Sequence, residues 1–216
     1  MHVEASDSIA PSRALIFRGH GQSLAVIIDG AGSWGSGREA ADRSRDLLSQ
    51  RWGDAKRWSV DALVQDISTT ATSTPNDLRD REFGWSFSVT CLLCTDDLVE
   101  CVAAGFYRVD VLGPSSRETL FRPEMLVDQL LANGTVTPQT VGSFDQRHVC
   151  LGPFVGDRDH VGLTSVRRRV APDEVVLVTH AARFDVSSMS IPKSAAALAT
   201  LAKPDSHASP VVLVRH

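Results

Sequence analysis

The most informative segment of this 216-residue chain is Ser23-Leu-Ala-Val-Ile-Ile-Asp29-Gly-Ala-Gly-Ser-Trp-Gly-Ser-Gly37. Its apolar first half predicts a buried strand over 23–28, and the four glycines within 29–37 predict a loop whose backbone can approach another group closely. A helix is expected to follow over 38–51. We expect its inner side to carry Ala40, Ala41, Leu47 and Leu48.

The rest of the chain alternates between strand and helix patterns around this segment. Apolar residues at helical spacing (Val60, Leu63, Val64 and Ile67) predict a second helix over 59–70. Further helices are predicted at 123–132 and 195–202. Strands are predicted at 13–17, 85–93, 98–104, 107–112, 163–169, 175–178 and 211–214. Short turns between most of these strands favour antiparallel pairing, so the pattern predicts one α+β domain over residues 1–216.

Composition excludes several classes of function. The 22 basic and 26 acidic residues give a formal charge of -4, which offers no general attraction for nucleic acid or anionic lipid. No apolar run approaches the roughly 20 residues that span a bilayer, and the N-terminus lacks a signal-peptide layout. We expect a cytoplasmic protein, of bacterial type by composition, that binds neither nucleic acid nor membranes.

The four cysteines are too few for a disulfide scaffold in a chain of this length. Cys91 and Cys94 form a C-x-x-C pair within an apolar run that reads as a buried strand. Residues three apart on a strand point to opposite faces, so the two thiols should diverge. We therefore expect buried, chemically inert cysteines rather than a redox or zinc motif.

Several short segments stand in a fixed order along the chain. They are His2–Asp7, Val26–Gly32, Gly84–Thr90, Cys101–Arg108, Val149–Gly152, Pro172–Ala181 and Lys203–Val214. The series resembles the ordered motifs of PPM-type (type 2C) metal-dependent Ser/Thr protein phosphatases, across nearly the whole chain. The resemblance implies an α-β-β-α sandwich of two mostly antiparallel sheets flanked by helices, with two metal ions at one end of the sheets.

The resemblance also assigns roles to single residues. It places Asp7, Asp29 and the carbonyl of Gly30 at metal-ligand positions. His2 stands where the family has its phosphate-binding arginine. In such enzymes two Mg²⁺ or Mn²⁺ ions activate a water that hydrolyses a phosphoester.

Other ligand positions of the family are replaced in this chain. Phe106, His180 and Ser206 stand where the family has aspartates. Hard divalent cations need several anionic oxygens, so a binuclear Mg²⁺ centre of the usual kind should not assemble. His180 with Asp29 could hold one softer Mn²⁺, and a one-residue slip would bring in Asp205, although on a strand such a slip reverses the face. We expect no cofactor, or a single weakly bound Mn²⁺ or Mg²⁺.

Structural interpretations stand beside these functional ones. Asp29 equally suits a loop-capping role, Asp7 and His180 suit ordinary positions at strand ends, and the run Arg167–Arg169 suits a solvated sheet edge. Trp34, in the glycine-rich loop, suits either a partner contact or an inward-facing packing role.

The first hypothesis is therefore a catalytically impaired phosphatase-like domain, a pseudophosphatase that acts by binding a protein such as a phosphoprotein or a kinase. The alternative is a divergent Mn²⁺-dependent phosphoprotein phosphatase that uses Asp29, Asp7 and His180. A purely structural role, with the former cleft closed by Phe106 and Trp34, is the third.

Overall fold

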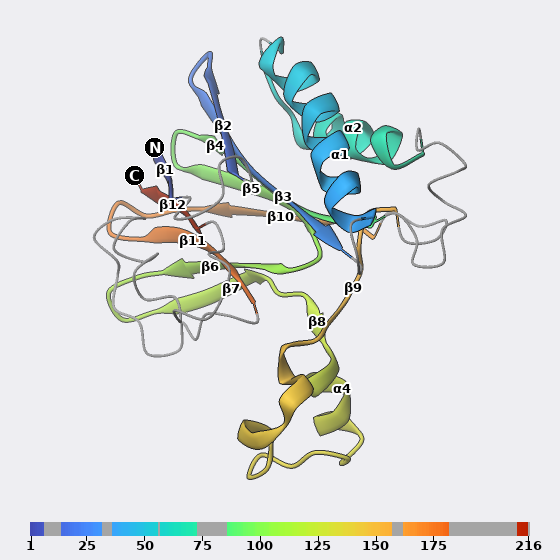
Figure 1. The fold of residues 1–216 in the computed structure, drawn as a ribbon. Coiled ribbons are helices and arrows are strands. Elements are labelled where there is room, and N and C mark those ends of the chain that lie inside the picture. The colour runs from blue at the N-terminus through green and yellow to red at the C-terminus, as the bar shows by residue number, and fades with distance from the viewer. Residues whose placement is uncertain are drawn as a thin grey trace.

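A computed structural model describes residues 1–6, 14–31, 36–55, 57–72, 86–156, 162–181 and 211–215. Two five-stranded antiparallel sheets pack face to face, and helices α1 and α2 cover the outer face of one of them (Figure 1). None of the helices in these ranges is long and apolar enough to cross a membrane. The α+β class predicted from the sequence is confirmed.

The helix-covered sheet has the strand order β10-β5-β4-β3-β2. Its strands are β2 (Ala14–Gly19), β3 (Gln22–Ala31), β4 (Ser86–Thr95), β5 (Leu98–Ala104) and β10 (Thr164–Arg169). The second sheet has the order β1-β12-β11-β6-β7. Its strands are β1 (His2–Ser6), β6 (Tyr107–Leu112), β7 (Arg117–Phe121), β11 (Val175–His180) and β12 (Val211–Arg215).

Side-chain alternation along β4 builds two cores at once. Phe87, Val89, Cys91 and Leu93 face the helices, whereas Leu92 and Cys94 face the second sheet. The prediction that Cys91 and Cys94 diverge is thus confirmed, because they lie in different clusters. Burial raises the pKa of the Cys91 thiol and raises that of Cys94 to about 12, so neither is a reactive thiolate.

Helix α1 (Ser36–Gly53) and helix α2 (Val60–Thr72) agree with the predicted pair. The placement of Leu47 on the inner side was wrong, since its side chain is 48% exposed. The buried face of α1 instead runs through Ala41, Ser44, Leu48 and Trp52, which recur every three or four residues. Leu47 lies at the edge of that stripe.

The part of the chain that connects β7 to β10 includes a small substructure that projects from the sandwich (Figure 1). It contains β8 (Glu124–Met125), α4 (Leu126–Ala132), two 3₁₀ turns (Val141–Ser143 and Asp145–His148) and β9 (Cys150–Gly152). The predicted helix over 123–132 was too long at its start, because Glu124 and Met125 pair with β9 instead. Strands β1 and β7 were not predicted, and the predicted helix over 195–202 lies outside the described residues.

The arginine run lies on β10, an edge strand. Arg167 and Arg169 are exposed and face Glu100 and Asp97, whereas Arg168 is half-buried on the opposite face and pairs with Glu118 and Glu174. This confirms the interpretation as a charged sheet edge, which discourages pairing with another chain.

Candidate functional site

Two antiparallel sheets bring several strand ends to the same end of the sandwich. On the first sheet, Asp29 near the end of β3 lies opposite Ser88 near the start of β4. On the second sheet, His180 at the end of β11 lies opposite Tyr107 at the start of β6. The two sheets meet here because the Tyr107 hydroxyl reaches across the sandwich to Asp29.

Both carboxylate oxygens of Asp29 accept hydrogen bonds. The hydroxyl of Tyr107 donates to Oδ2 at 3.1 Å, and the backbone N–H of Gly30 donates to Oδ1 at 3.0 Å. Tyr107 is fully buried, with 0% of its surface exposed. A buried phenol needs an acceptor, and Asp29 supplies it.

An aromatic cluster (Phe106, Tyr107, Phe154 and His180) adjoins Asp29 through the hydroxyl of Tyr107. The ring of Phe106 stacks on His180 at a centroid distance of 5.5 Å and an interplanar angle of 14°. Phe154 packs on Phe106 at 4.8 Å, and the edge of His180 meets Tyr107 at 5.6 Å. The cluster joins strands β6 and β11 to the segment that returns from the projecting substructure.

The turn before β6 is fixed so that Phe106 points into this cluster. Gly105 adopts a φ of +96°, and a Cβ atom there would lie 2.5 Å from the Cβ of Ser88. The Ser88 hydroxyl donates to the carbonyl of Ala104 at 3.1 Å and accepts from the Phe106 backbone N–H at 3.0 Å. Only glycine fits this turn, and Ser88 fastens it.

The glycine-rich segment also has a packing function. A Cβ atom on Gly30 would lie 2.3 Å from the carbonyl carbon of Gly37, at the start of α1. The end of β3 and the start of α1 therefore press together at a distance that only glycine allows. This close approach is the one predicted from the sequence.

The structure brings some predicted site residues together and separates others. Asp29 and His180 both contact Tyr107, and Gly30 is adjacent. His2 lies at the opposite end of its sheet, because it pairs with Arg215, which in turn pairs with Val175 at the start of β11. Asp7, Trp34 and Asp205 lie outside the described residues.

Among the described residues alone, the donors around Asp29 do not make up a site for a pair of hard divalent cations. Within the described ranges, no group of three or more His, Cys, Asp or Glu side chains lies close enough to hold one metal ion. Octahedral Mg²⁺ or Mn²⁺ needs several oxygen ligands, whereas this part of the site offers one carboxylate next to aromatic rings.

Two residues of the site were missed by sequence reasoning. Tyr107 is the only tyrosine of the chain and directly follows Phe106, which was a usable signal for a special position. Phe154 carried no signal, because its contact with Phe106 depends on how the projecting substructure returns to the sheets.

Comparison with known proteins finds likeness in structure alone. No protein-family model and no curated protein matches the sequence. Among solved structures, phosphatase Stp1 from Staphylococcus aureus superposes with a TM-score of 0.75 at 17% identity, covering 98% of this chain and 92% of that chain.

Two further structures show the same likeness. The PPM Ser-Thr phosphatase MsPP from Mycobacterium smegmatis gives a TM-score of 0.65 at 14% identity over 100% of this chain and 98% of that chain. The catalytic domain of PstP, in complex with two manganese ions, gives 0.66 at 16% identity over 98% and 96%. This chain has the fold of the PPM-type serine/threonine phosphatases.

Proposed function

We propose that this protein is a catalytically impaired phosphatase-like domain that acts by binding a protein. The observation that carries the proposal is the contact between Tyr107 and Asp29. In the motif resemblance Asp29 is a metal ligand, yet here its Oδ2 oxygen accepts a hydrogen bond from a buried phenol. Phe106 and Phe154, which belong to the same aromatic cluster as Tyr107, offer a cation no oxygen from their side chains.

The physical argument concerns competition for the Asp29 carboxylate. A dication that took the place of the tyrosine hydroxyl on Oδ2 would break the hydrogen bond of a buried group to a carboxylate, which costs about 1–3 kcal/mol. The aromatic cluster that adjoins Asp29 also supplies no second carboxylate to replace water lost from the hydration shell of the ion. Both effects weaken metal binding, and hydrolysis by a metal-bound water depends on it.

The partner class follows from the fold and the charge. A retained phosphatase fold suits recognition of a phosphoprotein or of the kinase that produces it. The formal charge of -4 disfavours nucleic acid and anionic membranes as partners. We propose a cytoplasmic protein partner of this kind.

Calorimetric titration of Mn²⁺ into metal-stripped protein tests the proposal, with Asp29→Ala as the matched control. We expect binding that is absent or no tighter than millimolar, and unchanged in Asp29→Ala. Micromolar binding that disappears in Asp29→Ala would overturn the proposal.

That second outcome would favour the divergent Mn²⁺-dependent phosphatase with Asp29, Asp7 and His180 as ligands. One observation supports this alternative: Asp29 and His180 both contact Tyr107, so two of the proposed ligands lie at the same end of the sandwich. Release of phosphate from a phosphoserine peptide, with and without Mn²⁺, separates the two functions.

Protein binding itself is tested by capture of partners from the native host on immobilised protein. Wild type is compared with Trp34→Ala, because Trp34 in the glycine-rich loop is the proposed partner contact. A set of partners that is specific to wild type supports a binding role for the loop. Identical sets would count against the loop as the binding surface.

A further inference from the structure

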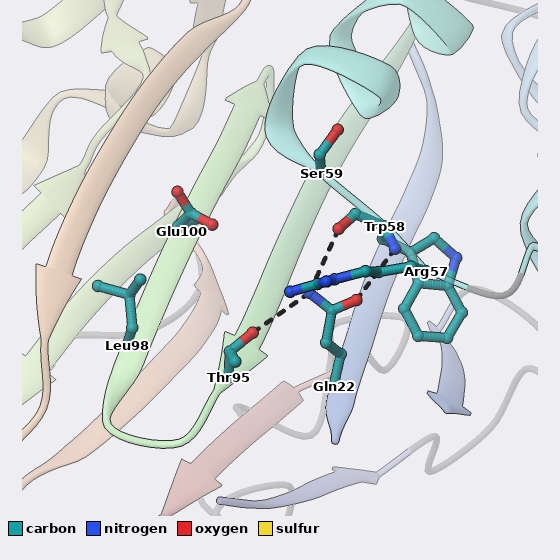
Figure 2. Close-up of a pocket in the computed structure, with 7 residues that line it drawn as sticks. All are labelled: Gln22, Arg57, Trp58, Ser59, Thr95, Leu98 and Glu100. Carbon is teal, nitrogen blue, oxygen red and sulfur yellow. Dashed lines mark hydrogen bonds between the residues drawn. The ribbon is translucent and has the colours of Figure 1, made fainter. Parts of the chain in front are cut away.

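A groove of about 490 Å³ lies at the other end of β3 from Asp29. One wall is the link between helices α1 and α2, with Arg57, Trp58 and Ser59, and the other is strand β5 with Leu98 and Glu100 (Figure 2). Gln22 and Thr95 form the floor. Gln22 and Asp29 are seven residues apart on one strand, which separates the groove from the former metal site by roughly 23 Å.

The first wall is held in place by a buried side-chain amide. Gln22 is 8% exposed and accepts from the backbone N–H of Trp58 at 3.0 Å. Its NH₂ group donates to the Trp58 carbonyl at 3.3 Å and to Thr95 Oγ1 at 3.4 Å (Figure 2). The indole N–H of Trp58 donates in turn to the Trp52 carbonyl. These bonds hold the wall in place before any ligand binds. Binding therefore does not carry the entropy cost of ordering the wall, and this favours affinity.

The second wall continues a row of residues that is buried further along β5. Val102 and Ala104 lie under the helices. Glu100 and Leu98 lie two and four residues before Val102 and therefore occupy the same face of the strand. The helices do not reach this end of the strand, so Leu98 and Glu100 are only half-buried. The wall therefore offers one apolar and one acidic side chain.

One charged residue that lines the groove has no ion-pair partner within the described part of the chain. Glu100 faces Arg167 at 3.8 Å, and Arg169 pairs with Asp97. Among the residues that the structure describes, none forms an ion pair with Arg57, which is exposed on the helix side of the groove. A partner therefore finds an uncompensated cation on one wall and a compensated carboxylate on the other.

We infer that this groove binds an extended segment of a partner protein that carries an acidic side chain next to an apolar one. The acidic group pairs with Arg57 and the apolar group lies on Leu98. The carboxylate of Glu100 already pairs with Arg167, so its wall does not attract the acidic side chain, and this difference between the walls sets the direction of the segment. The inference rests on the proposed binding role and gives that role a surface away from Asp29.

The test uses two synthetic hexapeptides with blocked ends, Gly-Ala-Glu-Leu-Ala-Gly and the same sequence with lysine in place of glutamate. Each is titrated into isotope-labelled full-length protein while backbone and indole N–H shifts are followed by NMR. We expect shifts at Trp58 and Leu98, and about fivefold tighter binding of the glutamate peptide, the effect typical of one exposed ion pair.

Charge reversal at Arg57 provides the decisive comparison. Arg57→Glu should reverse the preference between the two peptides, whereas Arg43→Glu, at an exposed arginine on the outer side of α1, should leave it within about twofold of wild type. The spectrum of each variant without peptide reports that it is folded.

Equal binding of both peptides, absent shifts at the groove, or a preference that survives Arg57→Glu would each overturn the inference. Failure here is distinguishable from failure of the proposed function. The Mn²⁺ titration measures metal binding at Asp29, at the other end of β3, and its result does not depend on the groove.

Discussion

The Tyr107 hydroxyl donates a hydrogen bond to the Asp29 carboxylate at 3.1 Å and so ties strand β6 of one sheet to strand β3 of the other. The Tyr107 side chain is fully buried, so its hydroxyl needs a hydrogen-bond acceptor inside the protein, and Asp29 provides one. The residue that the motif resemblance makes a metal ligand thus has a structural partner.

Removal of the hydroxyl in Tyr107→Phe should lower the free energy of unfolding by about 1–2 kcal/mol, as expected for a hydrogen bond to a charged group. In an Asp29→Ala background the same change should be neutral or stabilising, because the buried hydroxyl has already lost its acceptor. Urea denaturation of the four proteins gives the coupling energy. Additive effects would show that the bond contributes nothing.

Carboxylates introduced at two positions where the resembled family has aspartates should improve metal binding. In Phe106→Asp/His180→Asp two further oxygen ligands would approach Asp29, and both positions are only half-buried, so the substitutions are tolerable. We expect Mn²⁺ binding at least about tenfold tighter than in wild type, because each added carboxylate contributes charge and a ligand oxygen. Circular dichroism checks the fold, and unchanged affinity in a folded variant contradicts the assignment of these positions.

A fully buried carboxylate lies on the outer face of the second sheet. Asp110 is 0% exposed and accepts from Arg108 at 2.8 Å, Arg117 at 3.3 Å and Thr119 at 2.7 Å. Asp110→Asn leaves two arginines without their buried partner and should cost about 3 kcal/mol of stability. Glu118→Gln, which breaks an exposed pair with Arg168, should cost less than about 1 kcal/mol. Equal costs in urea denaturation would refute the difference in burial as the cause.

The pair between Arg168 and Glu174 makes stability depend on pH. The hydrogen bonds from Arg168 hold the pKa of the Glu174 carboxyl below its usual range. A depressed carboxyl pKa stabilises the fold above the unfolded value of about 4.3, and that stabilisation is lost as the pH falls through the folded value.

Glu174→Gln should therefore lower the free energy of unfolding at pH 7 by about 1 kcal/mol, a modest figure because water screens the pair. The gap between variant and wild type should close at pH 3. Thermal denaturation at both pH values measures it, and a gap that persists at pH 3 would mean that the variant lost packing rather than charge.

The cysteines should differ in reactivity. Burial raises the pKa of Cys94 and Cys101 to about 12, and raises that of Cys91 as well. At pH 8 only about one in ten thousand Cys94 or Cys101 thiols is then ionised, so iodoacetamide should not modify them in the folded protein. Cys150, half-buried in β9, is the expected site of any native labelling. Mass spectrometry before and after denaturation checks this, and rapid native labelling of Cys91 would contradict its burial.

Local patterns predicted most of the sheets, because the buried face of a strand appears in the sequence as apolar residues with a period of two. The run at 23–28 and the opposite faces of Cys91 and Cys94 needed only the two-residue repeat of a strand. The charged edge at Arg167–Arg169 followed from the same repeat. Strand β7 (Arg117–Phe121) was not predicted, since its Arg-Glu-Thr start is polar and has weak strand propensity. Backbone pairing with β6 stabilises it as a strand.

Leu47 shows the corresponding limit for helices. Its spacing from Ala40 satisfies helical periodicity, but which edge of an apolar stripe is covered depends on where the sheet lies beneath it. The sequence predicts which residues of α1 form an apolar stripe, and the position of the neighbouring strands decides which of them are buried.

By itself, the sequence determined the α+β class and the close backbone approach at Gly30, because each depends on residue type and short spacing. Tertiary structure alone decided what surrounds Asp29. Tyr107 lies 78 residues further along the chain, and strand register brings its hydroxyl to the carboxylate, whereas Phe154 reaches the adjoining aromatic cluster from outside the two sheets. The same register carries His2 to the far end of its sheet. Register is set by the sum of many burial and hydrogen-bonding terms across the whole sandwich, so no local pattern contains it.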